Sequence, residues 1–127
     1  VSEQASRAES RALLIDWLRR YVRPHFECRL QTLADRHGFH YHSMQLRRQR
    51  TRWGSCSRRG VISLNLCGAF QSPDVLDYLM LHELVHTRHM NHSERYWRAV
   101  EAVCPAWREL DRALTRGWQQ VPQWVFR

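Results

Sequence analysis

The sequence has no lysine. All 20 of its basic residues are arginine, and they outnumber the 12 acidic residues to give a formal net charge of +8. It also has no run of about 18 or more apolar residues, which excludes a membrane-spanning helix. The opening Val1-Ser2-Glu3-Gln4 shows neither the basic nor the apolar segment of a signal peptide, and without an initiating Met we expect a trimmed or processed form. No repeat or Pro/Gly-rich linker divides the chain, so we expect one domain over residues 1–127.

The four cysteines form no C-x-x-C pair. Their scatter argues against a thiolate zinc site and against a disulfide framework. We therefore expect reduced thiols in a cytoplasmic protein, mostly as small buried hydrophobes. A chain of 127 residues, 43% of them hydrophobic, can bury a core without such cross-links. The cysteines are Cys28, Cys56, Cys67 and Cys104.

Two helices are expected at the N-terminus. Apolar residues recur at helical spacing over residues 6–22, and Arg23-Pro24 should then break or kink the helix, because proline lacks the amide hydrogen. A second helix follows and ends at Gly38. The arginines between the apolar positions should form a solvated outer face. The apolar face of the second helix holds Phe26, Leu30, Leu33 and Ala34.

A change of apolar period to two indicates strands from Phe39 onward. The first strand is expected over residues 39–46, with His40 and His42 on its other face. Ser57–Gly60 has the composition of a turn, and residues 61–66 that of a returning strand. We expect a hairpin or a short meander, with Asn65 on the same face as Val61 and Ser63.

Ser72-Pro73-Asp74 is a strong helix start, with a capping hydroxyl, a proline in the first position and an acid in the first turn. This helix should run towards His89, and Asn91 should help to reverse the chain, because asparagine tolerates the left-handed conformation. Two more helices should follow, one capped by Ser93 and one opening at Pro105. The last helix should stop near Gly117, and the apolar tail after it should pack back through Trp118, Trp124 and Phe126.

The chemistry is concentrated in His82-Glu83-Leu84-Val85-His86, which fits the pattern H-E-x-x-H inside a well-capped helix. Two histidines four residues apart project from one face and can share a single ion. Zinc accepts imidazole nitrogens, and in catalytic sites it leaves a fourth position to water. Glu83 is rotated by about 100° from His82. It can therefore flank the metal, accept a proton from the metal-activated water and deliver it to the leaving amine.

A third ligand is expected from residues downstream of this motif. His92 follows the expected chain reversal and can swing back towards the first two histidines. His89 lies about 10.5 Å along the helix from His82, too far to share the ion while the helix continues. Glu101 is the alternative, because some zincins take a carboxylate from the following helix. Four histidines have no ligand spacing to the site, although two of them, His40 and His42, could face the cleft: His25, His37, His40 and His42.

These residues resemble the YgjP-like metallopeptidase family of the zincin clan, over about Leu30–Trp107. The resemblance implies a zincin-like α+β core, with N-terminal helices, a small twisted sheet over the active-site helix and C-terminal helices. It also implies His92 as third ligand. The same H-E-x-x-H-x5-H spacing occurs in WLM-type proteases, which act on DNA-bound proteins, so that relationship stays open. The resemblance rests on Arg52-Trp53-Gly54-Ser55-Cys56-Ser57, Ile62-Ser63-Leu64-Asn65, Asp77-Tyr78, His82–His86, and Asn91-His92-Ser93 followed by Tyr96-Trp97.

Further contacts to substrate or transition state are expected around the motif. Tyr96 stands where the family commonly has phenylalanine, so its hydroxyl could reach the site, and it or Arg52 could donate a hydrogen bond to an oxyanion. Gly54 has two interpretations: it allows an extended peptide to approach a sheet edge, or it forms a bulge while Trp53 anchors the core. Asn65 is a further candidate contact. Cys56 is not assigned as a ligand, because three histidines and water complete a zinc shell.

Three functions fit this sequence. The first is a zinc-dependent peptidase acting on a protein or peptide. The second is a basic, nucleic-acid-associated zinc module with DNA-targeted or absent proteolysis, since arginine suits phosphate recognition. The third is a zinc-stabilised scaffold without turnover. Nucleic-acid binding that weakens steeply with salt would favour the second, although an all-arginine composition can equally reflect genomic base composition. No membrane partner is expected.

Overall fold

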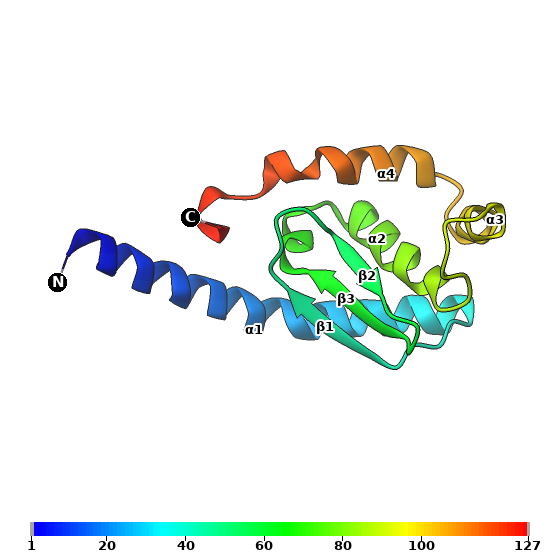
Figure 1. Cartoon of the computed structure of the whole chain (residues 1–127), viewed down its shortest axis with the longest axis horizontal. Coiled ribbons are helices and arrows are strands. Elements are labelled where there is room, and N and C mark those ends of the chain that lie inside the picture. Colours follow the sequence, from blue (N-terminus) through cyan, green and yellow to red (C-terminus); the bar gives the residue numbers. More distant parts are fainter. Residues whose placement is uncertain (1, 127) are drawn as a thin grey trace.

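The computed structural model describes residues 2–126, so Val1 and Arg127, the ends of the expected domain, lie outside the described residues. The fold is α+β, as predicted, with α-helices around a small mixed sheet (Figure 1). None of the described helices is long and apolar enough to cross a membrane. The elements are α1 (Glu3–His37), β1 (Ser43–Arg47), β2 (Gly54–Cys56), β3 (Val61–Asn65), η1 (Leu66–Phe70), α2 (Pro73–His86), α3 (Glu94–Val103), α4 (Trp107–Arg116), η2 (Gly117–Gln120) and η3 (Gln123–Val125).

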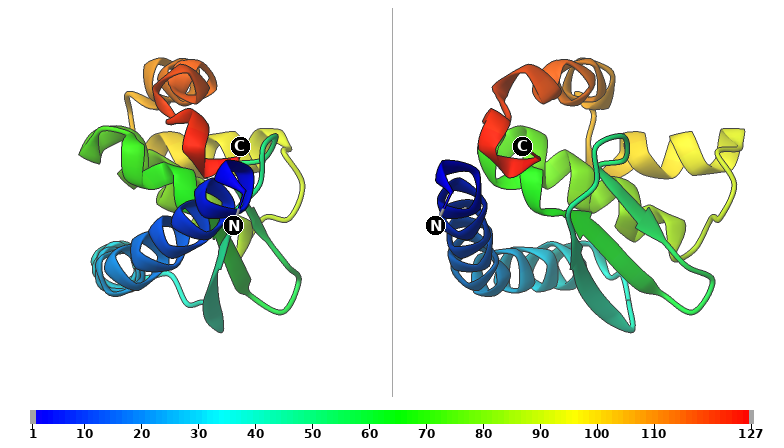
Figure 2. Two further views of the ribbon diagram at one scale, coloured as in Figure 1. Left: turned by 90° about the vertical axis from the view of Figure 1, so that its left-hand side faces the viewer. Right: turned by 60° about the vertical axis from the view of Figure 1, so that its left-hand side comes forward.

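Helix α1 is continuous, so of the break or kink expected at Arg23-Pro24 the break, with its separate second helix, is wrong. Pro24 lies inside the helix, and the buried stripe continues across it: Val22 and Phe26 are 2% and 3% exposed. An interior proline costs about 3 kcal/mol or more. Burying two large apolar side chains is worth about 1.5–3 kcal/mol each, which offsets that cost. The helix changes direction along its length (Figure 2), the usual response to a proline. It ends at Gly38 as predicted, in the left-handed conformation (φ 72°).

The sheet has the order β1-β3-β2, which corrects the expected meander. β1 pairs in parallel with β3, and β2 pairs with β3 in an antiparallel hairpin. β3 takes the centre because its Ile62 and Leu64 are fully buried. β1 starts at Ser43 rather than at Phe39, whose ring is instead buried beneath the guanidinium of Arg88. The predicted turn at Ser57–Gly60 is confirmed.

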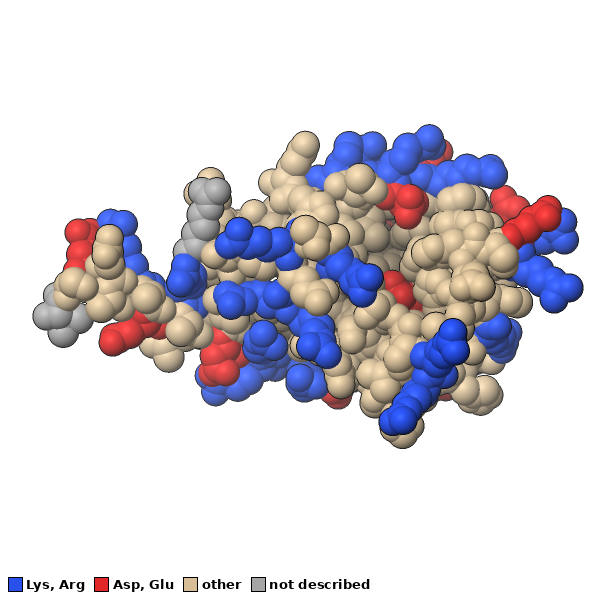
Figure 3. Space-filling view, in the orientation of Figure 1, with Lys and Arg blue, Asp and Glu red and all other residues tan. Residues whose placement is uncertain are grey.

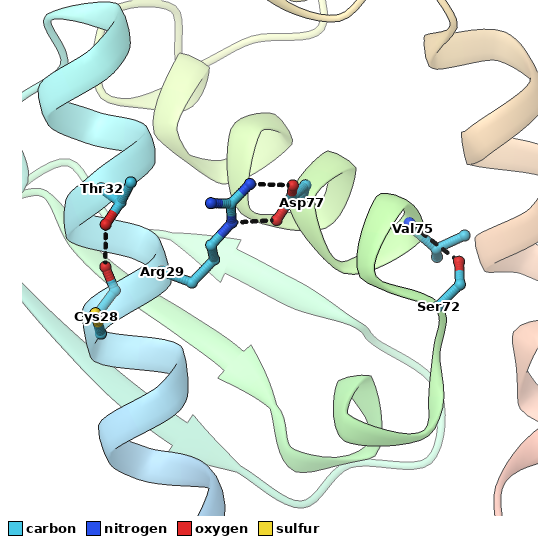
Figure 4. A network of polar contacts seen from close by, with 6 residues as sticks. All are labelled: Cys28, Arg29, Thr32, Ser72, Val75 and Asp77. Carbon is cyan, nitrogen blue, oxygen red and sulfur yellow. Dashed lines mark hydrogen bonds and ion pairs between the residues drawn. The ribbon is translucent and has the colours of Figure 1, made fainter.

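Helix α2 lies at the centre of the molecule and contacts α1, α3, α4, β2 and β3. It starts as predicted, with the Ser72 hydroxyl accepting a hydrogen bond from the Val75 amide. It ends at His86 instead of running on towards His89. Arg29 of α1 donates two hydrogen bonds to the Asp77 carboxylate of α2, at 2.7 and 2.5 Å (Figure 4). This half-buried pair fixes the two longest helices against each other.

The segments after α2 follow the predicted order with two corrections. Ser93 caps α3 as expected, but no described residue other than glycine has a positive φ, so the left-handed turn expected at Asn91 is wrong. The last helix begins at Trp107, two residues after the expected Pro105, because the chain first makes a turn there. It stops before Gly117, as predicted.

The C-terminal tail packs back, as predicted, and the arginine-rich loop holds it. Trp118 stacks on Trp53 with ring centroids 4.0 Å apart, and Val125 is fully buried. Arg48 and Arg50 donate to the carbonyls of Val125 and Phe126, at 2.9 and 3.1 Å. Figure 3 shows blue side chains gathered on this face, between α1 and the C-terminal segment. Part of the basic surface therefore has an internal partner.

The packing of α1 predicts unequal effects for the same substitution at two positions. Leu30 is 0% exposed, whereas Leu13 is 69% exposed on the projecting N-terminal turns. We expect Leu30→Ala to lower the free energy of unfolding by about 2–5 kcal/mol. Leu13→Ala, the matched control, should change it by less than about 0.5 kcal/mol. Urea unfolding followed by circular dichroism measures both, and equal losses would contradict the position of the core.

Candidate metal centre

Three histidines converge on one point. The ligand nitrogens of His82, His86 and His92 all lie within 4.8 Å of one another. The first two are one turn apart on α2, and His92 lies in the loop before α3. The Nε2 atoms of His86 and His92 are 3.0 Å apart. Two nitrogens that each lie about 2.0–2.1 Å from a tetrahedral ion are ~3.3 Å apart, so this donor set fits a single metal ion.

The ionisation of the histidines also suits a metal. Burial, together with the nearby His86 and His92, lowers the pKa of His82 to about 3. Burial also lowers the pKa of His86, against a hydrogen bond to the backbone that raises it. Both rings are therefore neutral at physiological pH, and neutral imidazole is the form that binds metals. The Nδ1 atom of His86 is 3.0 Å from the carbonyl oxygen of His89, which leaves Nε2 to face His92.

The alternative ligands lie elsewhere. His89 contributes its backbone carbonyl to the orientation of His86, and its ring is not in the cluster. Glu101 is exposed on α3 and also outside the cluster. His40 and His42 are exposed and line neither of the cavities beside the histidines. Among the described candidates, the structure thus brings His92 to the pair on α2.

Aromatic rings support the histidines from α3 and α4. Tyr96 stacks on His86, with ring centroids 4.4 Å apart and planes at 25°. Its hydroxyl, which the sequence suggested for the site, donates to the carbonyl oxygen of His82 at 2.9 Å, and the whole residue is buried. Trp97 stacks on His92, and Trp107 stacks in turn on Trp97. This packing limits how the rings can turn.

Glu83 is buried between the histidines and strand β2. A Cβ atom at Gly54 would lie 2.9 Å from the Glu83 Oε2 atom and 3.1 Å from the Ser63 carbonyl, so only glycine allows this close approach. The strand register is regular, with Gly54 opposite Leu64, so the glycine does not mark a bulge. Burial raises the pKa of Glu83 to about 8, against the nearby charge of Arg52.

Two cavities, of about 250 and 310 Å³, flank Glu83. Arg52, Gly54, His82 and Glu83 line both of them. Trp53 lines the first, and the second extends along β2 past Cys56, whose thiol pKa is raised to about 11, chiefly by burial. A larger cavity of about 630 Å³ lies between α1 and α2, but it contains none of these groups. The reactive side chains therefore face the two smaller spaces.

The model of the YgjP-like metallopeptidase domain matches residues 1–117 of this sequence. The chain belongs to that family. Its fold is similar to the crystal structure of the metallopeptidase zymogen of Pyrococcus abyssi abylysin, with a TM-score of 0.63 and 26% identity over 72% of this chain and 93% of that one. No curated protein sequence matches the chain significantly. The family expected from the sequence is thus confirmed.

Asn65 holds the loop beside the cleft of this YgjP-like domain, and Trp53 lines one of the two cavities. The Asn65 amide donates to the carbonyls of Gln49 and Arg52, at 2.6 and 2.7 Å, and accepts from the Cys67 amide. It lines neither cavity, so the structure shows it fixing the loop that carries Arg52. Trp53 packs on Trp118, and its buried indole N–H has no partner among the described residues.

Two residues at this YgjP-like site were not assigned to it from the sequence, although Tyr78 is among the residues that carry the family resemblance. The Tyr78 hydroxyl donates to the Asp111 carboxylate at 2.8 Å and lies 3.2 Å from Nδ1 of His82. Burial and Asp111 both raise the pKa of Tyr78, so the phenol keeps its proton. Tyr78 precedes His82 by four residues, and this helical spacing could have revealed it. Asp111 lies on α4, and no local spacing links it to the motif.

The cluster predicts which alanine substitutions release a metal. His92→Ala should lose most of the zinc affinity, since it removes one of three nitrogens that meet at one point. His89→Ala should bind nearly as the wild type does, because its contact comes from the backbone. Glu101→Ala should lose no more than about tenfold. Competition with a chelator of known zinc affinity measures all three. If Glu101→Ala bound no metal while His92→Ala bound it as the wild type does, the choice of His92 as third ligand would be wrong.

Proposed function

We propose that this YgjP-like domain is a zinc-dependent peptidase that hydrolyses peptide bonds, with Glu83 as general base and acid. One observation carries the proposal: three imidazole nitrogens and a buried carboxylate line the same cleft. Three imidazole nitrogen donors with a fourth side open to a cavity suit zinc in its catalytic arrangement. The chemistry that zinc supplies at such a site is polarisation of a carbonyl and activation of water at neutral pH.

Glu83 is placed to move the proton. It follows His82 directly on α2 and lines both cavities, yet its carboxylate is not in the histidine cluster. The side chain is only 4% exposed and has no salt bridge among the described residues. Burial raises the pKa of this carboxyl group, but the positive charge of a metal on the adjacent histidines would lower it again. The ionised group can then accept a proton from water and donate it to the leaving amine nitrogen.

Strand β2 supplies a place for the substrate backbone. It is an edge strand of the described sheet, and Gly54, Ser55 and Cys56 line the cavity beside the histidines. An extended peptide can add to such an edge through main-chain hydrogen bonds. Arg52, exposed at the mouth of both cavities, is our candidate for contact with a developing oxyanion. For Tyr96 we propose support of His82 and His86 rather than contact with substrate.

The free thiols are compatible with the compartment we propose. All four cysteines are unpaired in the described part of the chain, and two of them are buried. We infer a cytoplasmic setting, where thiols stay reduced, and a protein or peptide as substrate. Arg48 and Arg50 already bind the C-terminal segment, so we give the basic surface no separate nucleic-acid function.

The separation of base from ligands predicts that Glu83→Gln keeps zinc and the fold but loses turnover. The amide has nearly the same shape as the carboxylate but cannot accept the proton, and general acid–base catalysis contributes about 10²–10⁴-fold. Cleavage of an unstructured peptide library, read by mass spectrometry, gives the rates, and metal analysis of the same samples gives the zinc content. Loss of zinc in this variant would show that Glu83 is a ligand. Absence of cleavage by the zinc-loaded wild type across the library would contradict the proposed activity.

The contact at Gly54 predicts a loss of turnover from a single added methyl group. Gly54→Ala should push β2 away from Glu83, since the new Cβ would meet a backbone carbonyl as well as the carboxylate. We expect the cleavage rate to fall at least about tenfold while zinc stays bound, because misplacement by 1 Å can cost about 10²-fold. Arg58→Ala, in the exposed turn after β2 and outside both cavities, is the control. Equal rates for the two variants would contradict the close approach.

A further inference from the structure

The Tyr78 hydroxyl lies between the ring of His82 and the carboxylate of Asp111. We propose that Tyr78 and Asp111 are positioning residues which hold the His82 proton on Nδ1, so that Nε2 presents its lone pair to the metal. The inference rests on the proposed function, since it concerns the same metal site. It assigns to helix α4 a part in metal binding that the spacing of the histidines does not reveal.

The direction of the two hydrogen bonds follows from a count of protons. A phenol has one proton to donate, and an ionised carboxylate can only accept. The contact to Asp111 is short, at 2.8 Å, and hydrogen bonds to a charged acceptor are the stronger kind. The phenol proton therefore belongs to Asp111. The 3.2 Å contact to Nδ1 of His82 then requires the imidazole to be the donor, with the phenol oxygen as its acceptor.

The three histidines are oriented by different means. His86 is held by the backbone just after α2, since its Nδ1 atom is 3.0 Å from the carbonyl oxygen of His89. His92 lies in an exposed loop and packs on Trp97. His82 instead relies on the Tyr78 hydroxyl one turn earlier on α2, which in turn donates to Asp111 of α4. Metal-binding histidines generally donate their second N–H to a carboxylate or carbonyl, directly or through another group, and here a tyrosine carries that contact to Asp111.

Burial keeps this arrangement in place. Tyr78 lies on the buried face of α2 and is 0% exposed, so its hydroxyl has no contact with bulk water. Asp111 is half-buried at the wall of the smaller cavity, and its backbone is held in α4, where its carbonyl accepts from the Thr115 hydroxyl. Removal of the Tyr78 hydroxyl would leave the Nδ1 atom of His82 without this acceptor. The ring could then carry its proton on Nε2, the atom needed for the metal.

The first measurement is the tautomer of His82 in the metal-free protein. Nitrogen-15 NMR of the imidazole rings, assigned through His82→Ala, should show the proton on Nδ1 in the wild type. In Tyr78→Phe, which keeps the ring and its packing, the Nε2-protonated form should appear. Tyr41→Phe is the control, because it removes a phenol that donates to Gln31 and lines neither cavity beside His82. A wild-type His82 protonated on Nε2 would overturn the proposal, whatever the peptidase assay shows.

The second measurement is zinc affinity by chelator competition. Tyr78→Phe should lower it by about 10–100-fold. Asp111→Ala should have a comparable effect, because the phenol proton is then free to turn to Nδ1. The double variant should be little weaker than the worse single variant, since both act through one contact. Tyr41→Phe should bind as the wild type does. Losses that simply add in the double variant, or an unchanged Tyr78→Phe, would refute the relay.

The design separates this proposal from the proposed function. If the wild type binds no zinc, the function fails, while the NMR result still decides whether Tyr78 fixes the tautomer. If zinc binds and peptides are cleaved but the tautomer is unaffected by Tyr78→Phe, only the relay fails. Should Tyr78→Phe not fold, as judged by circular dichroism, Asp111→Ala on the half-buried face of α4 answers the same question. A wild-type tautomer and affinity in that variant would refute the proposal.

Discussion

The 14 residues of helix α2 have to pack in the core and also carry four polar side chains of the site, those of Tyr78, His82, Glu83 and His86. Buried polar groups are costly unless each has a partner, so the neighbouring elements are constrained by what the helix carries. β2 needs glycine at position 54 because the Glu83 carboxylate lies against it. α3 places Tyr96 over His86 and donates its hydroxyl to the His82 carbonyl. α4 places Asp111 where the Tyr78 hydroxyl requires an acceptor.

The parts of the fold that depend on adjacent residues could be predicted from the sequence. Ser72 caps α2, and Gly38 ends α1, because both effects act within one helical turn. The two separate helices expected around Pro24 are one helix for a different reason. An interior proline destabilises a helix, but the buried residues on either side of Pro24 pack against the rest of the molecule. This packing depends on residues distant in the sequence, so it could not be predicted from the residues near Pro24. The parallel pairing of β1 with β3 is similarly a long-range choice, since it depends on which strand has the most apolar side chains to bury.

The residues of the site likewise divide into those fixed by local helix geometry and those placed by long-range packing. The relative directions of His82, Glu83 and His86 could be predicted from the sequence, because helical geometry fixes them. The approach of His92 depends on the end of α2, which comes at His86, earlier than the periodicity indicated, so the chain leaves the helix directly beside the second histidine. Asp111 could not be found, since its place follows from how α4 docks. Asn65 was expected to contact substrate, but its side chain bonds to the loop that carries Arg52 and lines neither cavity.

The C-terminal part of the chain consequently belongs to the site rather than to its surroundings. Trp107 at the start of α4 supports the ring that packs on His92, and Asp111 in the next turn reaches Tyr78. Beyond the helix, Trp118 packs on Trp53 of the loop that carries Arg52. Both walls of the cleft therefore depend on the docking of one segment. By linkage, a ligand that binds only the assembled cleft must favour the docked state of that segment by the same free energy with which docking favours the ligand. On the function proposed above, metal binding and the packing of α4 would be one equilibrium, with the phenol of Tyr78 as one of the contacts that join them.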